Sequence, residues 1–258
     1  MSVLEVRREG FVAHVTLNRP EVRNAFNAEL IAALSAAFED LSKHDDLRVI
    51  VLGANGKAFC AGADLNWMRS MADYNWAQNH ADAQKLADML WTLYQCPVPV
   101  VGKIQGDCYA GGTGLAAICD VLIASDNATF CLSEARLGLS PATISPYVVR
   151  ALGEQASRRY MVTAERFSAA QAHALGFVHD LCGADELEAR VAQMVATLVA
   201  NGPKATRACK KLARDVSGEP ISKQLRDETA RRIADIRVSE EGKEGLASFL
   251  HKRPAGWV

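Results

Sequence analysis

Segments that have the pattern of β-strands alternate with segments that have the pattern of α-helices over the first two-thirds of the chain. Residues 11–17 alternate in polarity and favour a strand. Asn27 precedes a stretch whose apolar residues recur at helical spacing, and its side chain suits a helix N-cap. The remaining segments are predicted strands at 48–52, 98–104 and 119–124, and a predicted helix over 75–96 that ends before Pro97. This alternation predicts an α/β fold.

The pattern changes after Asn201-Gly202-Pro203, since Pro203 suits the first turn of a helix and helical stretches then continue to about residue 252. No strand pattern occurs in this part. We therefore predict a core over residues 1–200 and a helical region over residues 201–258, which we expect to pack on something other than its own sheet. Its helical apolar stripe contains Ile221, Leu225, Ile233 and Ile236.

Composition excludes several classes of protein. The chain has 258 residues, of which 49% are hydrophobic and 23% charged, and this is typical of a globular protein. The net charge of −1 gives no basic surplus for binding nucleic acid. No apolar run approaches the length of about 20 residues that crosses a membrane, and the N-terminus lacks the apolar core of a signal peptide. We expect a cytoplasmic protein with no nucleic-acid or membrane partner.

Cysteine and histidine spacing predicts no metal site. The chain has seven cysteines, an odd number, and no Cys-x-x-Cys pair, so a reducing compartment fits better than a disulfide framework. Its six histidines show no His-Glu-x-x-His spacing. We expect no metal and no tightly bound cofactor.

Two glycine-rich segments, 58–65 and 106–115, carry the candidate chemistry, and each follows a predicted strand. The second leads into a predicted helix, and such a turn presents free N–H groups that suit a developing oxyanion. A dinucleotide loop is disfavoured, because Gly112-Thr113-Gly114 begins the Gly-x-Gly-x-x-Gly pattern but Ala117 ends it. A glycine turn that is only structural remains an alternative at this point.

Together these segments resemble the crotonase (enoyl-CoA hydratase/isomerase) superfamily over nearly the whole chain. The resemblance implies a spiral of ββα turns, an acyl-CoA substrate, and a C-terminal helical region that forms a homotrimer or a dimer of trimers. The matching motifs are Asn18-Arg19-Pro20, Asn24-Ala25-Phe26-Asn27, Phe59 to Leu65, Gly111-Gly112, Leu115-Ala116, Cys119-Asp120, Phe130 with Glu134, Leu137-Gly138, and Phe249 to Trp257.

The resemblance also implies roles for single residues. The amides of Ala63 and Gly111 would form an oxyanion hole for the thioester oxygen, which preorganised backbone donors suit. Glu134 falls where the family places an acid/base residue, although a surface partner for Arg136 is the alternative. The residues implied for coenzyme A are Arg23, Ala61, Asp64, Leu65 and Lys252. For Arg23 and Lys252, an ordinary solvated charge on the protein surface is an equally good alternative.

Two departures from the family pattern narrow the prediction. Hydratases with two carboxylates carry a glutamate where this chain has Gly114, and residues 140–150 stand where the family often has a glycine-rich Pro-Gly-x-Gly-Gly segment. With Trp67 and Met68, these departures resemble the branch that hydrates 3-methylglutaconyl-CoA and isohexenylglutaconyl-CoA. Trp67, Met68 and Gly114 would then line the substrate pocket, although Trp67 and Met68 also suit an ordinary core.

The leading hypothesis is hydration of a 2-enoyl-CoA thioester. A Δ3,Δ2-enoyl-CoA isomerase is the alternative within enzymes, because moving one proton between carbons needs only one carboxylate. A relative that binds acyl-CoA without catalysis is the alternative of a different class.

Overall fold

The computed structural model describes residues 2–257, so the outer ends of the two predicted regions, Met1 and Val258, lie outside the described residues. The strands form a six-stranded sheet in the order β1-β2-β3-β5-β7-β10 and a four-stranded sheet in the order β4-β6-β8-β9. Their bounds are β1 (Leu4–Glu9), β2 (Val12–Leu17), β3 (Val49–Ala54), β4 (Ala58–Cys60), β5 (Val100–Ile104), β6 (Asp107–Tyr109), β7 (Val121–Ser125), β8 (Thr129–Cys131), β9 (Arg166–Ser168) and β10 (Asp180–Cys182).

The chain winds as a spiral in which one strand joins the large sheet, the next joins the small sheet, and a helix follows. The strands β3, β5 and β7 pair in parallel in the large sheet, and β4, β6 and β8 pair in parallel in the small one. This arrangement confirms the predicted α/β spiral. The helical elements are η1 (Pro20–Val22), α1 (Ala28–Leu41), α2 (Leu65–Met71), α3 (Trp76–Gln95), α4 (Gly111–Ala117), η2 (Glu134–Leu137), α5 (Ser145–Leu152), α6 (Glu154–Thr163), α7 (Ala169–Ala174), α8 (Leu187–Ala200), α9 (Pro203–Val216), α10 (Lys223–Val238) and α11 (Glu240–Leu250).

The longer predicted elements are present with small shifts of their ends. Asn27 caps α1, because its side chain accepts a hydrogen bond of 2.9 Å from the amide of Leu30. Asn75 and Gln78 form a capping box at the start of α3. The strands of the small sheet have three residues each. This is too few to show an alternating pattern, so the sequence does not predict them.

Helices cover both faces of the large sheet. On one face, α1 and α3 bury apolar residues such as Leu34, Phe38 and Leu93 in the main core. On the other face, α8 packs Leu187 and Val191 against strand residues that include Val101. No helix within residues 2–257 is both long and apolar enough to span a membrane.

The first tail helix, α9, docks on the core of its own chain, at residues that lie outside the strands. Arg207 donates to the carbonyl oxygens of His44 and Leu47, at 2.7 and 2.9 Å. Lys210 donates to the carbonyl of Val98 at 2.9 Å and pairs with Asp120 at 2.6 Å. These long cationic side chains satisfy oxygens where core elements begin or end, so polar contacts rather than an apolar stripe hold α9.

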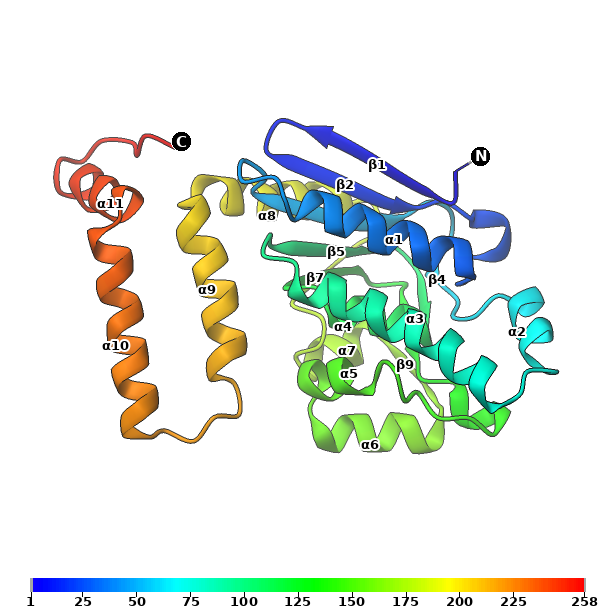
Figure 1. The fold of residues 1–258 in the computed structure, drawn as a ribbon. Coiled ribbons are helices and arrows are strands. Elements are labelled where there is room, and N and C mark those ends of the chain that lie inside the picture. The colour runs from blue at the N-terminus through cyan, green and yellow to red at the C-terminus, as the bar shows by residue number, and fades with distance from the viewer. Residues whose placement is uncertain (1, 258) are drawn as a thin grey trace.

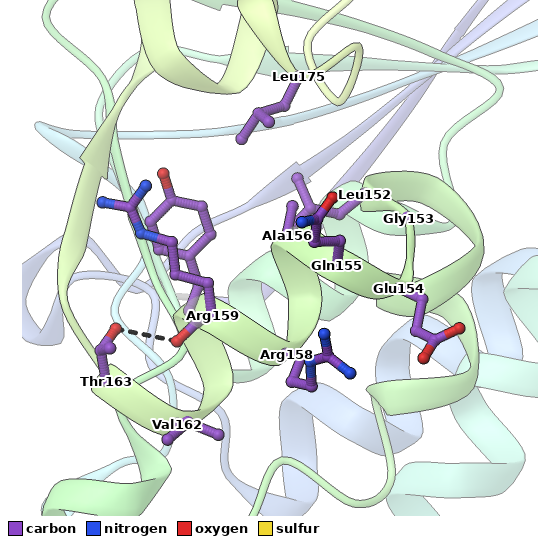
Figure 2. Close-up of a pocket in the computed structure, with 11 residues that line it drawn as sticks. Leu152, Gly153, Glu154, Gln155, Ala156, Arg158, Arg159, Val162, Thr163 and Leu175 are labelled. Carbon is purple, nitrogen blue, oxygen red and sulfur yellow. Dashed lines mark hydrogen bonds between the residues drawn. The ribbon is translucent and has the colours of Figure 1, made fainter.

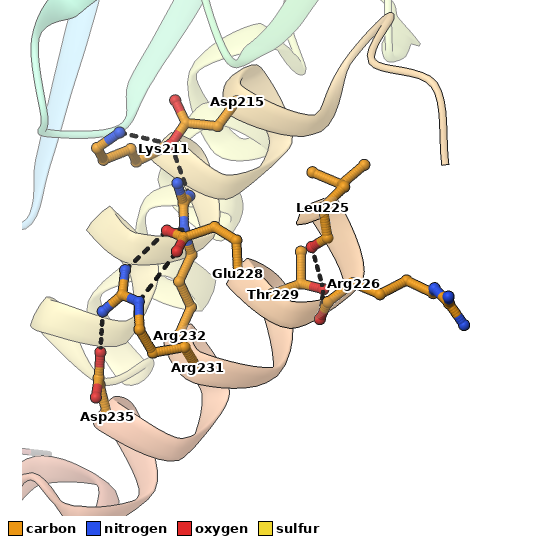
Figure 3. Close-up of polar contacts among 9 residues, drawn as sticks. All are labelled: Lys211, Asp215, Leu225, Arg226, Glu228, Thr229, Arg231, Arg232 and Asp235. Carbon is orange, nitrogen blue, oxygen red and sulfur yellow. Dashed lines mark hydrogen bonds and ion pairs between the residues drawn. The ribbon is translucent and has the colours of Figure 1, made fainter. Parts of the chain in front are cut away.

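Helices α10 and α11 lie beyond α9, away from both sheets (Figure 1). Arg232 on α10 pairs with Asp215 on α9 at 2.6 Å, inside the charged network drawn in Figure 3. Glu241 on α11 accepts hydrogen bonds from the amides of Lys204 and Ala205 at the start of α9. Large apolar side chains remain exposed on this outer part of the tail, namely Ile221, Ile233, Val238, Leu246, Phe249 and Leu250.

We predict that Lys210→Met lowers the free energy of unfolding by about 2 kcal/mol, because the Asp120 carboxylate and the Val98 carbonyl both lose a charged donor. Lys211→Met is the matched control. Lys211 is 64% exposed and pairs with Asp215 one turn away, whereas Lys210 is 6% exposed, so the control costs at most about 0.5 kcal/mol. Urea denaturation followed by circular dichroism measures both, and equal losses would contradict this account of α9.

Candidate functional site

Three of the predicted site residues follow the carboxyl ends of neighbouring parallel strands in the small sheet. Ala63 follows β4, Gly111 follows β6 and Glu134 follows β8. Register places Cys60 beside Cys108, and Tyr109 beside Cys131. Because carboxyl ends of parallel strands share one edge of a sheet, the three residues gather at that edge, where ligands of α/β proteins usually bind.

The backbone around Ala63 is paired in a way that leaves its own amide free. Phe26 forms a parallel bridge with Ala63: its N–H donates to the Gly62 carbonyl at 2.7 Å, and its carbonyl accepts from Asp64 at 2.8 Å. In a parallel ladder the residue between two bonded neighbours points its N–H to the other side. Within residues 2–257 the Ala63 amide has no hydrogen-bond acceptor, and Ala63 is exposed.

The amide of Gly111 also has no hydrogen-bond acceptor in the described part of the chain, and the residue before it is strained. Ala110 has φ 49° and ψ −119°, a left-handed conformation that is costly for a residue with a side chain. Hydrogen bonds hold it there, since its N–H donates to Cys131 at 2.8 Å and its carbonyl accepts from Thr113 at 2.9 Å. The carbonyl of Ala110 thus points into α4, and the N–H across the same trans peptide points out of the helix.

The two segments that carry these amides touch each other. A Cβ built on Gly62 would lie 3.0 Å from the Cβ of Ala110. Gly62 directly precedes Ala63, and Ala110 directly precedes Gly111. The structure therefore brings the two predicted donors together on adjoining stretches of backbone.

Glu134 is a half-buried acid without a charged partner. It is the first residue of η2, and its Oε2 atom is buried without a hydrogen-bond partner among the described residues. Burial raises the pKa of this carboxyl above its ordinary value. No ion pair joins Glu134 to Arg136 in residues 2–257, so the alternative of a surface pair has no support. An unpaired, desolvated carboxyl keeps its proton to a higher pH than an exposed one, which suits a group that must donate and accept a proton.

The space beside Gly114, where two-carboxylate hydratases carry the first of their two glutamates, is filled by another side chain. Gly114 lies one helical turn after Gly111 and is buried. A Cβ on Gly114 would lie 2.3 Å from Cγ2 and 2.8 Å from Cβ of Ile144. These are stiff atoms of a β-branched side chain that is only 2% exposed, so no side chain fits at position 114 beside them. Gly114 therefore packs against Ile144 and does not face open space.

The residues around α2 divide into buried and exposed positions. Asp64 caps α2 and pairs with Arg19 at 2.8 Å, so its carboxylate is occupied within the protein. Burial works to raise the pKa of Asp64, but hydrogen bonds from Arg19 and two backbone amides outweigh it, and the pKa is lowered. Leu65 is 69% exposed. Ala61, Trp67 and Met68 are half-buried, and Trp67 packs partly against the main core.

The two predicted coenzyme A cations do not meet within one chain. Arg23 is exposed and lies on the 23–26 segment beside the site, where its carbonyl accepts from the amide of Ala61 at 3.0 Å. Lys252 is exposed and follows α11. Figure 1 places α11 at the opposite end of the molecule from α2. Only Arg23 therefore lies near Ala63 and Gly111 in the same chain.

A cavity of about 740 Å³ lies elsewhere, along α6 and the end of α5 (Figure 2). Its lining includes Arg158, Arg159 and Thr163 and none of the predicted site residues. Arg159 is paired with Glu165 at 2.7 Å. Across residues 2–257, no cluster of three or more His, Cys, Asp or Glu side chains is placed to hold a metal ion.

Comparison with known proteins identifies the family of this chain. Residues 7–258 match the family model described as Enoyl-CoA hydratase/isomerase. The chain belongs to this family. The 2,3-dehydroadipyl-CoA hydratase of Escherichia coli K12 is 31% identical over 255 residues, covering 98% of this chain and 97% of that protein.

Solved structures of the enoyl-CoA hydratase/isomerase family superimpose closely. The enoyl-CoA hydratase of Shewanella pealeana has a TM-score of 0.95 and 42% identity, and the match covers 99% of this chain and 96% of that one. AtuE of Pseudomonas aeruginosa has a TM-score of 0.95 and 33% identity, covering 99% of both chains. The crotonase-like fold is therefore shared over the full length.

Sequence reasoning missed the roles of Arg19 and Ile144 in this family member. Arg19 lies far from Asp64 in sequence, and nothing in a single chain marks the two as partners. Ile144 belongs to segment 140–150, which the sequence marks as unusual without showing which of its residues contacts Gly114. Its shape complementarity to Gly114 is visible only after α4 and α5 pack together.

We predict that Glu134→Gln makes the protein more stable at pH 8 and changes its stability little at pH 4. When folding raises the pKa of a carboxyl, its contribution to stability is fully present below the unfolded-state pKa of about 4.3. This contribution is lost as pH rises through the pKa of the folded state, where the buried group must ionise. Glutamine does not ionise, so the variant avoids this loss. Thermal melts at the two pH values measure the change in Tm. Glu154→Gln, at an exposed acid, is the control, and a Glu134→Gln gain that is equal at both pH values would contradict the assignment.

Proposed function

We propose that this protein hydrates a 2-enoyl-CoA thioester, with the amides of Ala63 and Gly111 as its oxyanion hole and Glu134 as its acid/base residue. The observation that carries the proposal is a desolvated carboxyl without a partner at the same sheet edge as two free backbone N–H groups. Membership of the family supports acyl-CoA chemistry.

In the proposed reaction the thioester oxygen accepts hydrogen bonds from both amides. Water adds its oxygen at Cβ, and negative charge moves onto the thioester oxygen, where preorganised donors stabilise it. Glu134 gives its proton to Cα and takes one from the attacking water, so it is restored at the end of the turnover. A raised pKa keeps a fraction of Glu134 protonated and ready to donate. This chemistry needs no tightly bound cofactor.

The proposed substrate is a branched glutaconyl-type thioester such as 3-methylglutaconyl-CoA. Support comes from the unusual segment 140–150, whose Ile144 occupies the volume that a side chain at position 114 would need. Trp67 and Met68 on α2 follow directly after the Ala63 segment and are half-buried, which suits walls of an acyl pocket. Arg23, with the backbone of Ala61, Asp64 and Leu65, is proposed to contact coenzyme A.

A Δ3,Δ2-enoyl-CoA isomerase is the second candidate, favoured by the single carboxylate. Among residues 2–257, Glu134 is the one acid at the site without an ion-pair partner, since Asp64 is paired with Arg19. The pKa of Glu134 responds to burial and a backbone hydrogen bond rather than to another charged group. An absorbance assay separates the candidates. Hydration removes the conjugated enoyl-thioester band, isomerisation of a 3-enoyl-CoA creates it, and binding with neither change indicates a relative without catalysis.

We predict that Glu134→Gln lowers kcat by about 10²–10⁴-fold and changes the Kd for a CoA ester by only a few-fold, because the amide cannot carry the proton. The assay is loss of enoyl-thioester absorbance with a panel of enoyl-CoAs. Glu154→Gln is expected to retain wild-type rates. A Glu134→Gln variant with near-wild-type kcat on the best substrate would remove Glu134 from the mechanism.

We also predict a trimer or a dimer of trimers, in which Lys252 completes the coenzyme A site of a neighbouring subunit. The exposed apolar side chains of α10 and α11 need cover, and Lys252 lies far from the site of its own chain. Sedimentation velocity at micromolar concentration tests this, and a stable monomer there would remove both the interface and the shared site.

A further inference from the structure

The hydratase proposal gives no role to the motif Asn24-Ala25-Phe26-Asn27, although it forms the ladder beside Ala63. We propose that Phe26 is a positioning residue that holds the two amides of the oxyanion hole in fixed relation to each other. This inference rests on the proposed function. It assigns the task to one residue, whose backbone is bonded to one half of the hole and whose ring packs against the other half.

The backbone of Phe26 fixes the half that contains Ala63. Its N–H and carbonyl bond to Gly62 and Asp64, at 2.7 and 2.8 Å, and these residues flank Ala63 on either side. A twist of the Ala63 peptide would break one of these bonds. The direction of the Ala63 N–H therefore depends on the position of Phe26.

The ring of Phe26 fixes the half that contains Gly111. Its Cδ2 and Cε2 atoms each lie 2.8 Å from the point where a Cβ on Gly111 would stand. The ring thus packs flush against the glycine and leaves no room for a side chain there. Phe26 is 1% exposed, so surrounding core atoms prevent the ring from moving back.

Arg19 holds segments 23–26 and 61–64 together through its side chain. One guanidinium nitrogen donates to the carbonyl of Ala25, next to Phe26, and another pairs with Asp64 at 2.8 Å, next to Ala63. The pair is largely buried, with 14% and 7% of the two side chains exposed. The register between the two segments is therefore fixed, and so is the position at which the Phe26 ring contacts Gly111.

Loss of the ring has a distinct expected effect. The backbone ladder to Ala63 persists in any Phe26 variant that folds, but the strained Ala110-Gly111 peptide loses its support and relaxes toward the empty space. The two donors then no longer fit one oxygen. Since a misplacement of about 1 Å can cost about 10²-fold in rate, kcat falls while KM, set mainly by contacts to coenzyme A, stays within about 3-fold.

The test compares Phe26→Leu and Phe26→Ala with the matched pair Phe38→Leu and Phe38→Ala. Phe38 lies on α1 in the same core and is fully buried, so its truncation removes equal volume without touching the site. Three quantities are measured in the full-length protein: Tm, the kcat and KM for the best enoyl-CoA, and the absorption maximum of bound 4-dimethylaminocinnamoyl-CoA. That maximum moves to longer wavelength when the thioester oxygen is hydrogen-bonded.

We expect all four variants to lower Tm. Phe26→Ala lowers kcat by about 10–100-fold, Phe26→Leu lowers it less, and both reduce the wavelength shift of the bound probe, whereas both Phe38 variants keep the wild-type shift and kcat. Folded Phe26 variants that retain the full shift and kcat would overturn the inference and make Phe26 a core residue only. A wild-type protein that neither shifts the probe nor turns over any enoyl-CoA would instead overturn the oxyanion hole itself.

Discussion

The site depends on a short parallel ladder between residues 23–26 and 61–64, which joins the loop between β2 and α1 to the turn after β4. Each bond of this ladder satisfies a backbone group that would otherwise be buried without a partner. The alternation of a parallel ladder then leaves the Ala63 amide unpaired on the open side. A free N–H donor is thus created by pairing its neighbours, and Arg19 and Asp64 keep that pairing in register.

Glu134 and Ala110 show that the site is held in an unfavourable state by the fold around it. A buried carboxyl oxygen without a hydrogen bond costs free energy, as does an alanine at positive φ. Both residues lie beside strands of the small sheet, whose hydrogen bonds, such as that from Ala110 to Cys131, supply the restraint. Residues that reduce stability and gather at one edge are expected of a catalytic site.

The pair Gly114 and Ile144 gives physical meaning to two departures that the sequence shows separately. The first departure is the missing carboxylate at Gly114, and the second is the altered segment that contains Ile144. The two are linked where α4 packs against the start of α5, because Ile144 occupies the volume that a side chain at position 114 would need. Within residues 2–257, Glu134 is therefore the one acid at the site that no cation pairs with. Hydration and isomerisation both remain compatible with one carboxyl, and the choice between them lies with the substrate and the placement of water.

The sequence by itself determined the α/β class, the longer helices and strands, the strand-free tail and the family, because periodicity and caps are local and the motifs keep their spacing. The candidate residues Ala63, Gly111 and Glu134 were also within its reach. Only the tertiary structure decided that β4, β6 and β8 share one edge, that α9 docks on its own core, and that Phe26 and Ile144 border the site. Those facts depend on contacts between segments distant in the chain, whose register no local pattern encodes.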